Sequence, residues 1–306
     1  PMWWWWWLIS CGGVEALVAA PSAAVRRPSL RSSATFVGEA LSGEESALKA
    51  KVLQLGACLD RGQGYNPTSG DQYAERMKAA VAAIDALVAY GQGVGKNTAT
   101  LAKLAGRWEL VLSTVPHGIF RSSPFFLAID AAYRDAGAPE KAELFFKLHE
   151  LQTCSWGASK IGTVAQTVDD TTLTSEFDTQ IFALTVIPIV GWFKLLPTFG
   201  GCVVTVSKIT NLAEGPEPRL DLEVDYTTAK PVPGLKGLGE WIWSVKVPVG
   251  AVWRLLPWNK GKPPTCAIDV VYLDDDVRVV RDAAGDYFVY TRPVAGFGGG
   301  TGGEFE

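Results

Sequence analysis

Apolar and polar residues alternate along much of the chain, and the clearest example lies at 101–114, LAKLAGRWELVLST. This stretch predicts the end of a short helix, a hinge at Gly106 and then a strand. One face of the strand carries Trp108, Leu110 and Leu112, and the other face is mostly polar. We therefore expect one side of this strand to be dry and the other to face water.

Further strands follow the same pattern. The alternation recurs at 159–168, 172–177, 180–187, 199–209, 219–226 and 239–247. The segment 267–291 predicts three strands in a meander, with turns at Asp274–Asp276 and Ala284–Asp286. About eight to ten strands result, enough for a closed antiparallel barrel that holds one ligand. An early strand and a late meander that are both half apolar suit the seam of such a barrel, because closure removes exposed strand edges.

Four longer helices are predicted between the strands or before them. Helices at 42–61 and 69–91 have apolar stripes at helical spacing, and we expect them to cover one mouth of the barrel. A partner-binding hairpin is the alternative. Ser123 followed by Pro124 predicts the start of a third helix, and a fourth runs over 139–153. The last two are expected to form an apolar lid over the barrel mouth, and packing against the outside is the alternative.

Five stretches of this chain resemble the plastid lipid-associated proteins, also called plastid fibrillins or plastoglobulins. They are LAGRWELVLST (104–114), FRSSPFF (120–126), SEFD (175–178), VPGL (232–235) and YLDDDVRVVRDAAGDYFVY (272–290). The resemblance implies a mainly β fold with helices, a lipocalin-like antiparallel β-barrel that carries prenylquinones, carotenoids or fatty acids at thylakoids or plastoglobules. Leu112-Ser-Thr stands where many members have Tyr-Thr-Ser, so this chain lacks that tyrosine.

The resemblance also suggests where a ligand and a barrel floor lie. In lipocalin-like barrels the indole of the first strand plugs the floor, so we expect Trp108 there with Arg278 or Arg281 lying across it in a cation–π contact. The ligand-binding side chains are expected on the lid and on inward strand positions: Leu110, Leu112, Phe125, Phe126, Trp156 and Phe177. Binding by burial, at about 25 cal/mol per Å² of apolar surface, needs no cofactor.

The N-terminal region differs in composition from the rest. Residues 2–20 form an apolar run with five consecutive Trp, and 21–38 are rich in Arg, Ser and Ala without an acidic residue. This order predicts a signal-like leader fused to a transit region over 1–38, as for import into a plastid of secondary origin. A membrane anchor or a wrongly assigned start is the alternative. An N-terminal helical segment at 39–100, the barrel domain at 101–294 and a disordered tail at 295–306 follow.

Two Trp-rich segments, 187–201 and 232–262, interrupt the strand pattern. Neither has the run of about eighteen apolar residues that would span a membrane. Their aromatic side chains beside isolated Lys and Arg suit loops that dip into a bilayer surface, with filling of the core as the alternative. The expected interface residues are Trp192, Phe193, Trp253, Leu256 and Trp258.

The remaining composition limits the possible chemistry. A net charge of −4 argues against a duplex nucleic-acid binder. His117 and His149 are the only histidines, no catalytic or metal-binding motif is found, and the cysteines at 58, 154, 202 and 266 are expected to be buried thiols. We therefore expect a non-catalytic plastid protein without a metal ion.

Two other functions stay open at this point. One is a structural subunit bound to a photosystem or antenna complex, in which the Trp-rich segments would contact protein and pigment instead of lipid. The other is a lipocalin-type enzyme acting on a pigment or lipid, for which Glu176 and Asp178 are the candidate carboxylate pair.

Overall fold

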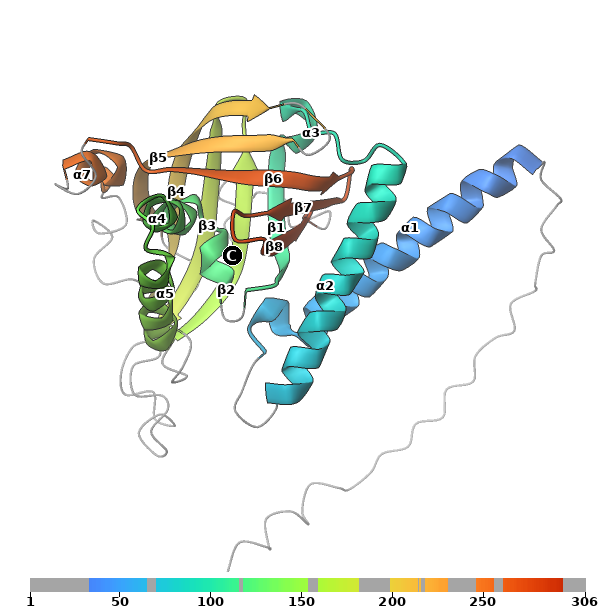
Figure 1. Ribbon diagram of the computed structural model, residues 1–306, viewed down its shortest axis with the longest axis horizontal. Helices are drawn as coiled ribbons and strands as arrows, with labels where there is room; N and C mark the ends of the chain where they lie inside the picture. The colour runs from blue at the N-terminus through green and yellow to red at the C-terminus, as the bar shows by residue number, and fades with distance from the viewer. Residues whose placement is uncertain are drawn as a thin grey trace, which may run out of the picture. The chain divides into compact units, whose positions relative to one another are not determined.

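The computed structural model describes residues 33–64, 70–115, 118–153, 159–181, 199–213, 215, 218–230, 246–255 and 261–293 (Figure 1). Within these ranges, the side chains of 33–42, 148–153, 159–160, 179–181 and 199–200 are left undescribed. The chain divides into a unit that ends at Leu41 and a second unit from Ser42 to Glu306, which contains the whole sheet.

Eight antiparallel strands close into one barrel in sequence order, so the predicted lipocalin-like barrel is confirmed (Figure 1). The strands are β1 (Gly106–Ser113), β2 (Ser159–Val168), β3 (Thr172–Ile181), β4 (Phe199–Ala213), β5 (Arg219–Lys230), β6 (Thr265–Leu273), β7 (Val277–Arg281) and β8 (Tyr287–Thr291). Pairing of β1 with β8 forms the seam. The two segments predicted at 172–177 and 180–187 begin as one strand, β3, and the part of the latter beyond Ile181 lies outside the described residues.

The helices lie before β1, between β1 and β2, and before β6. They are α1 (Ser33–Cys58), α2 (Gly70–Gly93), α3 (Leu101–Leu104), α4 (Pro124–Asp135), α5 (Pro139–Thr153) and α7 (Val249–Leu255), with short 3-10 turns η1 (Asp60–Gly62) and η2 (Ile119–Ser122). The predicted starts of α2 and α4 are confirmed, and Pro124 occupies the first turn of α4. The boundary expected at residue 38 falls within α1.

The prediction that the first two helices cover a mouth of the barrel is wrong. The described part of α1 and α2 pack on the outer face of β1, β6, β7 and β8, in a core cluster that includes Ile84, Leu87, Val279 and Val289. The approach is close, since a Cβ atom on Gly56 of α1 would lie 2.6 Å from the Val111 carbonyl oxygen. We call this the outer cluster.

Two β-bulges explain why this outer face is apolar. The pairing register shifts between Leu110 and Leu112 of β1 and between Val270 and Tyr272 of β6. Each bulge interrupts the strict alternation of faces, so Leu112 and Tyr272 join the outer cluster while Leu110 and Val270 stay inside. The expectation that Leu112 shares a face with Trp108 and Leu110 is therefore wrong.

The antiparallel order gives the barrel two unlike ends. At the end where β1 begins, which we call the floor end, β2 joins β3 and β6 joins β7 through the short turns 169–171 and 274–276. At the other end, which we call the rim, the chain leaves β1, β3 and β5 for its long connections. The α4–α5 insertion therefore starts from the rim.

Helices α4 and α5 pack against the barrel interior, as the lid prediction requires. Ala128 and Ile129 of α4 and Phe146 of α5 belong to the same core cluster as Trp108 and other inward side chains, which we call the inner cluster. Helix α4 contacts β4, β5 and β6, and α5 contacts β2. Apolar surface is thus continuous from the two helices into the barrel.

Candidate functional site

A row of polar side chains runs across the inner wall of the barrel. Trp108 of β1 pairs with Gln166 of β2, which pairs with Ser175 of β3, and the row continues through Thr205 of β4 to Thr227 of β5. Directly paired residues share a face of a sheet, so all five positions face the interior with Trp108. We call Gln166, Ser175, Thr205, Thr227 and the adjoining Arg278 the polar band.

The polar band climbs from the floor toward the rim, because barrel strands tilt. Trp108 and Gln166 lie near the floor end of β1 and β2, whereas Thr227 lies near the rim end of β5. Thr205 and Thr227 are bonded through their hydroxyls at 3.4 Å, but the buried Oγ of Ser175 has no hydrogen-bond partner. The serine and threonine side chains of the polar band are smaller than the leucines and phenylalanines of the inner cluster.

Arg278 is the one cation of the polar band and is fully buried. Its Nη2 atom donates to Gln166 Oε1 at 2.5 Å, whereas Nε and Nη1 have no hydrogen-bond partner. Gln166 in turn donates from Nε2 to the Ser122 carbonyl oxygen at 3.0 Å. Burial lowers the pKa of Arg278 to about 10, so the guanidinium stays charged at neutral pH.

Aromatic rings compensate part of the cost of burying this charge. The guanidinium carbon of Arg278 lies 4.3 Å from the centre of the Tyr290 ring and 5.2 Å from that of Trp108. Each cation–π contact contributes about 0.5–2 kcal/mol, and a hydrogen bond to a neutral amide about 0.5–1.5 kcal/mol. Since burying an ion costs several kcal/mol even after relaxation, these contacts leave the charge undercompensated.

The floor is built around Trp108, as expected. Its side chain is fully buried, its Nε1 donates to the Leu104 carbonyl oxygen at 2.7 Å, and Arg278 is the predicted late arginine beside it. Arg281 instead faces outward and pairs with Asp269 at 3.7 Å. The sequence did not suggest a second arginine, Arg292. Its guanidinium carbon lies 3.7 Å from the centre of the Trp108 ring, and its Nη1 donates to the Ala105 carbonyl oxygen.

Three of the predicted ligand-binding aromatics come together at the rim. Phe126 of α4 is buried. Its ring centre lies 5.5 Å from that of Phe125 and 6.5 Å from that of Phe177 on β3. Leu110 faces the interior. Leu112 belongs to the outer cluster and does not reach the interior, and Trp156 lies outside the described residues.

Of the predicted membrane-interface residues, only Trp253 lies in the described part of the chain. It is partly buried on α7 and packs against the inner cluster, as the core-filling alternative had it, whereas its neighbour Leu255 is 82% exposed. Trp192, Phe193, Leu256 and Trp258 lie outside the described residues. No helix in the described ranges combines the length and the apolar character needed to cross a bilayer.

The carboxylate pair considered for an enzyme does not face the interior. Glu176 and Asp178 alternate with the inward Ser175 and Phe177, and Glu176 pairs with Arg107 at 3.0 Å and with Lys230 at 2.6 Å. Burial would raise the pKa of Glu176, but hydrogen bonds from these two cations lower it. Glu176 therefore stays an ionised partner of two cations on the outer face.

Another acidic pair lines a hollow of about 410 Å³ between α4 and β5–β6. Asp130 accepts from Arg134 Nε at 2.6 Å, and Asp282 accepts from the backbone N–H groups of Ala284 and Asp286 at 2.9 Å. Burial raises the pKa of Asp282 to about 6. In the described residues, no group of three acidic, cysteine or histidine side chains is placed to hold a metal ion.

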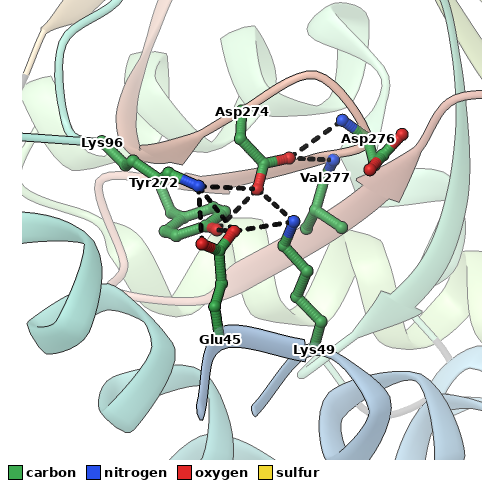
Figure 2. Close-up of polar contacts among 7 residues, drawn as sticks. All are labelled: Glu45, Lys49, Lys96, Tyr272, Asp274, Asp276 and Val277. Atoms are coloured by element: carbon green, nitrogen blue, oxygen red, sulfur yellow. Dashed lines mark hydrogen bonds and ion pairs between the residues drawn. The ribbon is translucent and has the colours of Figure 1, made fainter. Parts of the chain in front are cut away.

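A polar cluster joins α1 to the floor-end turn between β6 and β7 (Figure 2). Glu45 accepts from Lys96 Nζ at 2.6 Å and from the Tyr272 hydroxyl at 2.9 Å, and Lys49 pairs with both Glu45 and Asp274. Burial would raise the pKa of Asp274, but hydrogen bonds from Lys49 and Tyr272 hold it well below its ordinary value. This cluster attaches the helical segment to the barrel wall.

The cysteines match the prediction only in part. Cys202 and Cys266 are buried, and burial raises the pKa of each thiol to about 12, so neither is a reactive thiolate at neutral pH. Cys58 is exposed near the end of α1, contrary to the expectation of a buried thiol.

Sequence reasoning missed most of the polar band. Gln166, Ser175 and Thr205 fall in strands that the alternation predicted, at positions that share a face with apolar residues, whereas Thr227 lies one residue beyond the strand predicted at 219–226. The available signal was a run of small hydroxyl side chains at inward positions of adjacent strands. It needed the register between strands, which no local pattern supplies.

The fold defines a class: an eight-stranded, lipocalin-like antiparallel barrel with accompanying helices. Comparison of the chain with protein-family models, curated proteins and solved structures finds no match.

Proposed function

We propose that this protein is a non-catalytic binding protein that sequesters hydrophobic plastid molecules, such as prenylquinones, carotenoids or fatty acids, at thylakoid or plastoglobule surfaces. The observation that carries this proposal is the polar band on the inner wall of the barrel, which runs from the floor end toward the rim beside the apolar side chains of the inner cluster. The small side chains of Ser175, Thr205 and Thr227 along one tilted row, under an aromatic cover from α4, suit an elongated apolar guest.

Several further features support this proposal. The aromatic residues of α4 join the inner cluster, so a guest would be buried between strands and helices. Burial of an apolar surface releases about 25 cal/mol per Å², which suffices for binding without chemistry. The plastid location and the contact with a membrane surface rest on the leader composition, the Trp-rich segments and the family resemblance given above.

A matched pair of substitutions on β3 tests the binding site. The full chain is purified from plastid-bearing cells, and the lipids that accompany it are identified by mass spectrometry. Ser175→Phe fills the interior at the polar band, whereas Thr174→Phe places the same ring on the opposite face of the same strand. We expect apolar lipids to co-purify with the wild type and with Thr174→Phe. The amount of co-purified lipid per mole of protein is expected to fall at least fivefold with Ser175→Phe.

The outcomes separate the possibilities. Wild-type protein without a bound apolar molecule would refute the proposal. Equal retention by both variants would place the guest outside the barrel, and would also refute it. Imaging of a full-length fluorescent fusion checks the location, and a signal outside plastids would contradict that part.

A further inference from the structure

The barrel interior contains a cation that no carboxylate of the described residues neutralises. Arg278 is fully buried, and its Nε and Nη1 atoms have no hydrogen-bond partner. Burial, Tyr290 and Arg292 are the influences on its pKa, and no carboxylate is among them. An unpaired buried charge is unfavourable unless a group of opposite charge is placed against it.

The second deeply buried arginine of the described residues shows the usual solution. Arg121 is 6% exposed, has the carboxylate of Glu143 at 3.7 Å and lies 4.3 Å from the Phe146 ring centre. Arg278 has the aromatic contacts but lacks the carboxylate. The missing partner is therefore an anion that does not come from the described chain.

Other polar groups without partners gather near Arg278. Ser175 of β3 is paired directly with Gln166 of β2, and Gln166 is the hydrogen-bond partner of Arg278. The buried Tyr290 hydroxyl lies near Ser122 and Gln166 but has no hydrogen bond of normal geometry to another described residue. Burial raises its pKa to about 12, so it remains a donor at neutral pH. Donors from β3, β7 and β8 thus surround one end of the polar band.

We propose that Arg278 binds the carboxylate of a long-chain monocarboxylic acid, whose apolar chain follows the polar band toward the rim. This inference rests on the proposed function and narrows it, because it selects acids over uncharged carotenoids and quinones. A guanidinium donates several N–H groups to one carboxylate, which is the strong, charge-assisted form of hydrogen bond. Tyr290 is placed to add a hydroxyl donor to the same anion.

The geometry also explains why the acid group goes to the floor end. Arg278 lies next to Trp108 on the floor, while the phenylalanines of α4 and β3 gather at the rim. An acid bound with its carboxylate at Arg278 therefore places its apolar chain against the small side chains of the band and its far end beneath Phe126. The opposite orientation would bury the carboxylate against aromatic rings.

Paired ligands test this proposal on the unaltered protein. The full chain, stripped of lipid, is titrated with a fluorescent long-chain polyene fatty acid and with the methyl ester of the same acid, at pH 7.5. The ester keeps the apolar chain and removes the charge. We expect the acid to bind at least tenfold more tightly than the ester, which corresponds to about 1.4 kcal/mol.

Two arginine variants locate the effect. Arg278→Met keeps an unbranched side chain without the charge, and is expected to reduce the ratio of acid to ester affinity to about one. Arg281→Met is the matched control, because Arg281 lies on the same strand but faces outward. It is expected to keep the wild-type ratio. The wild-type measurement stands by itself if Arg278→Met fails to fold.

Each result decides a different point. Equal affinities of wild type for acid and ester would overturn the carboxylate site while leaving the apolar binding function intact. Binding of neither ligand would overturn the proposed function as well. A tenfold preference that persists in Arg278→Met would show that another group holds the carboxylate, and would overturn the assignment of Arg278.

Discussion

Replacing Trp108 with alanine tests the role of the barrel floor. The indole is fully buried, donates one hydrogen bond to Leu104 and is covered by Arg278 and Arg292. Truncation of a buried Trp costs about 3–5 kcal/mol, and the loss of one hydrogen bond and of the cation–π contacts adds about 1–2 kcal/mol. A total of about 5 kcal/mol is a large share of the 5–15 kcal/mol that stabilises a typical domain.

Urea unfolding followed by far-ultraviolet circular dichroism measures this loss. With a slope of about 2 kcal/mol per molar urea, we expect Trp108→Ala to lower the midpoint by about 2.5 M. Leu255→Ala is the control, since Leu255 is 82% exposed and its truncation is expected to change stability by less than about 0.5 kcal/mol. Affinity for the polyene acid, measured without urea, is expected to fall less than threefold.

The opposite pattern would refute this reasoning. If Trp108→Ala kept the wild-type midpoint but lost tenfold or more in affinity, the indole would line the binding site rather than close the floor.

Three further substitutions give independent checks. The pKa of Asp274 is held below that of an unfolded carboxyl, so its ion pairs stabilise the fold above about pH 4 and are lost as the pH falls further. Asp274→Asn is expected to reduce the fall of the melting temperature below about pH 4, and an unchanged fall would contradict the role of the cluster. The pKa of Asp282 is raised to about 6, so its charge costs stability as the pH rises from about 4 to 6; Asp282→Asn is expected to melt higher than wild type at pH 8 but not at pH 4, and a lower melting temperature at pH 8 would count against it. Phe126→Ala is expected to lose about 3 kcal/mol and to release the guest faster, whereas Leu144→Ala, 60% exposed on α5, serves as the control; equal release from both would mean that α4 does not retain the guest.

Local patterns in the sequence sufficed to predict the eight described strands, the turns and the start of α4, whereas most of the strand predicted at 239–247 lies outside the described residues. Asp274 and Asp282 show why, since each accepts hydrogen bonds from backbone N–H groups within its own turn. These interactions depend on neighbours in sequence, and so a single sequence displays them.

Features that depend on pairing between distant strands could not be predicted. The bulge between Leu110 and Leu112 is invisible in a strict alternation, and it turned a predicted pocket residue into an outer one. The sequence did not decide whether Arg278 or Arg281 lies beside Trp108, because that depends on which face of β7 points inward. The pairing of Arg278 with Tyr290 shows that Arg278 points inward. Arg292 was missed because its contact with the floor spans the seam.

That seam imposes an order on folding. Arg292 donates to the Ala105 carbonyl oxygen across 187 positions of the chain, and β8 completes the wall only by pairing with β1. Long-range pairing of this kind is slow, because the loop must close before its contacts stabilise it. During synthesis on a ribosome, β1 therefore has no partner for its seam edge until β8 has been made, and the barrel closes only then.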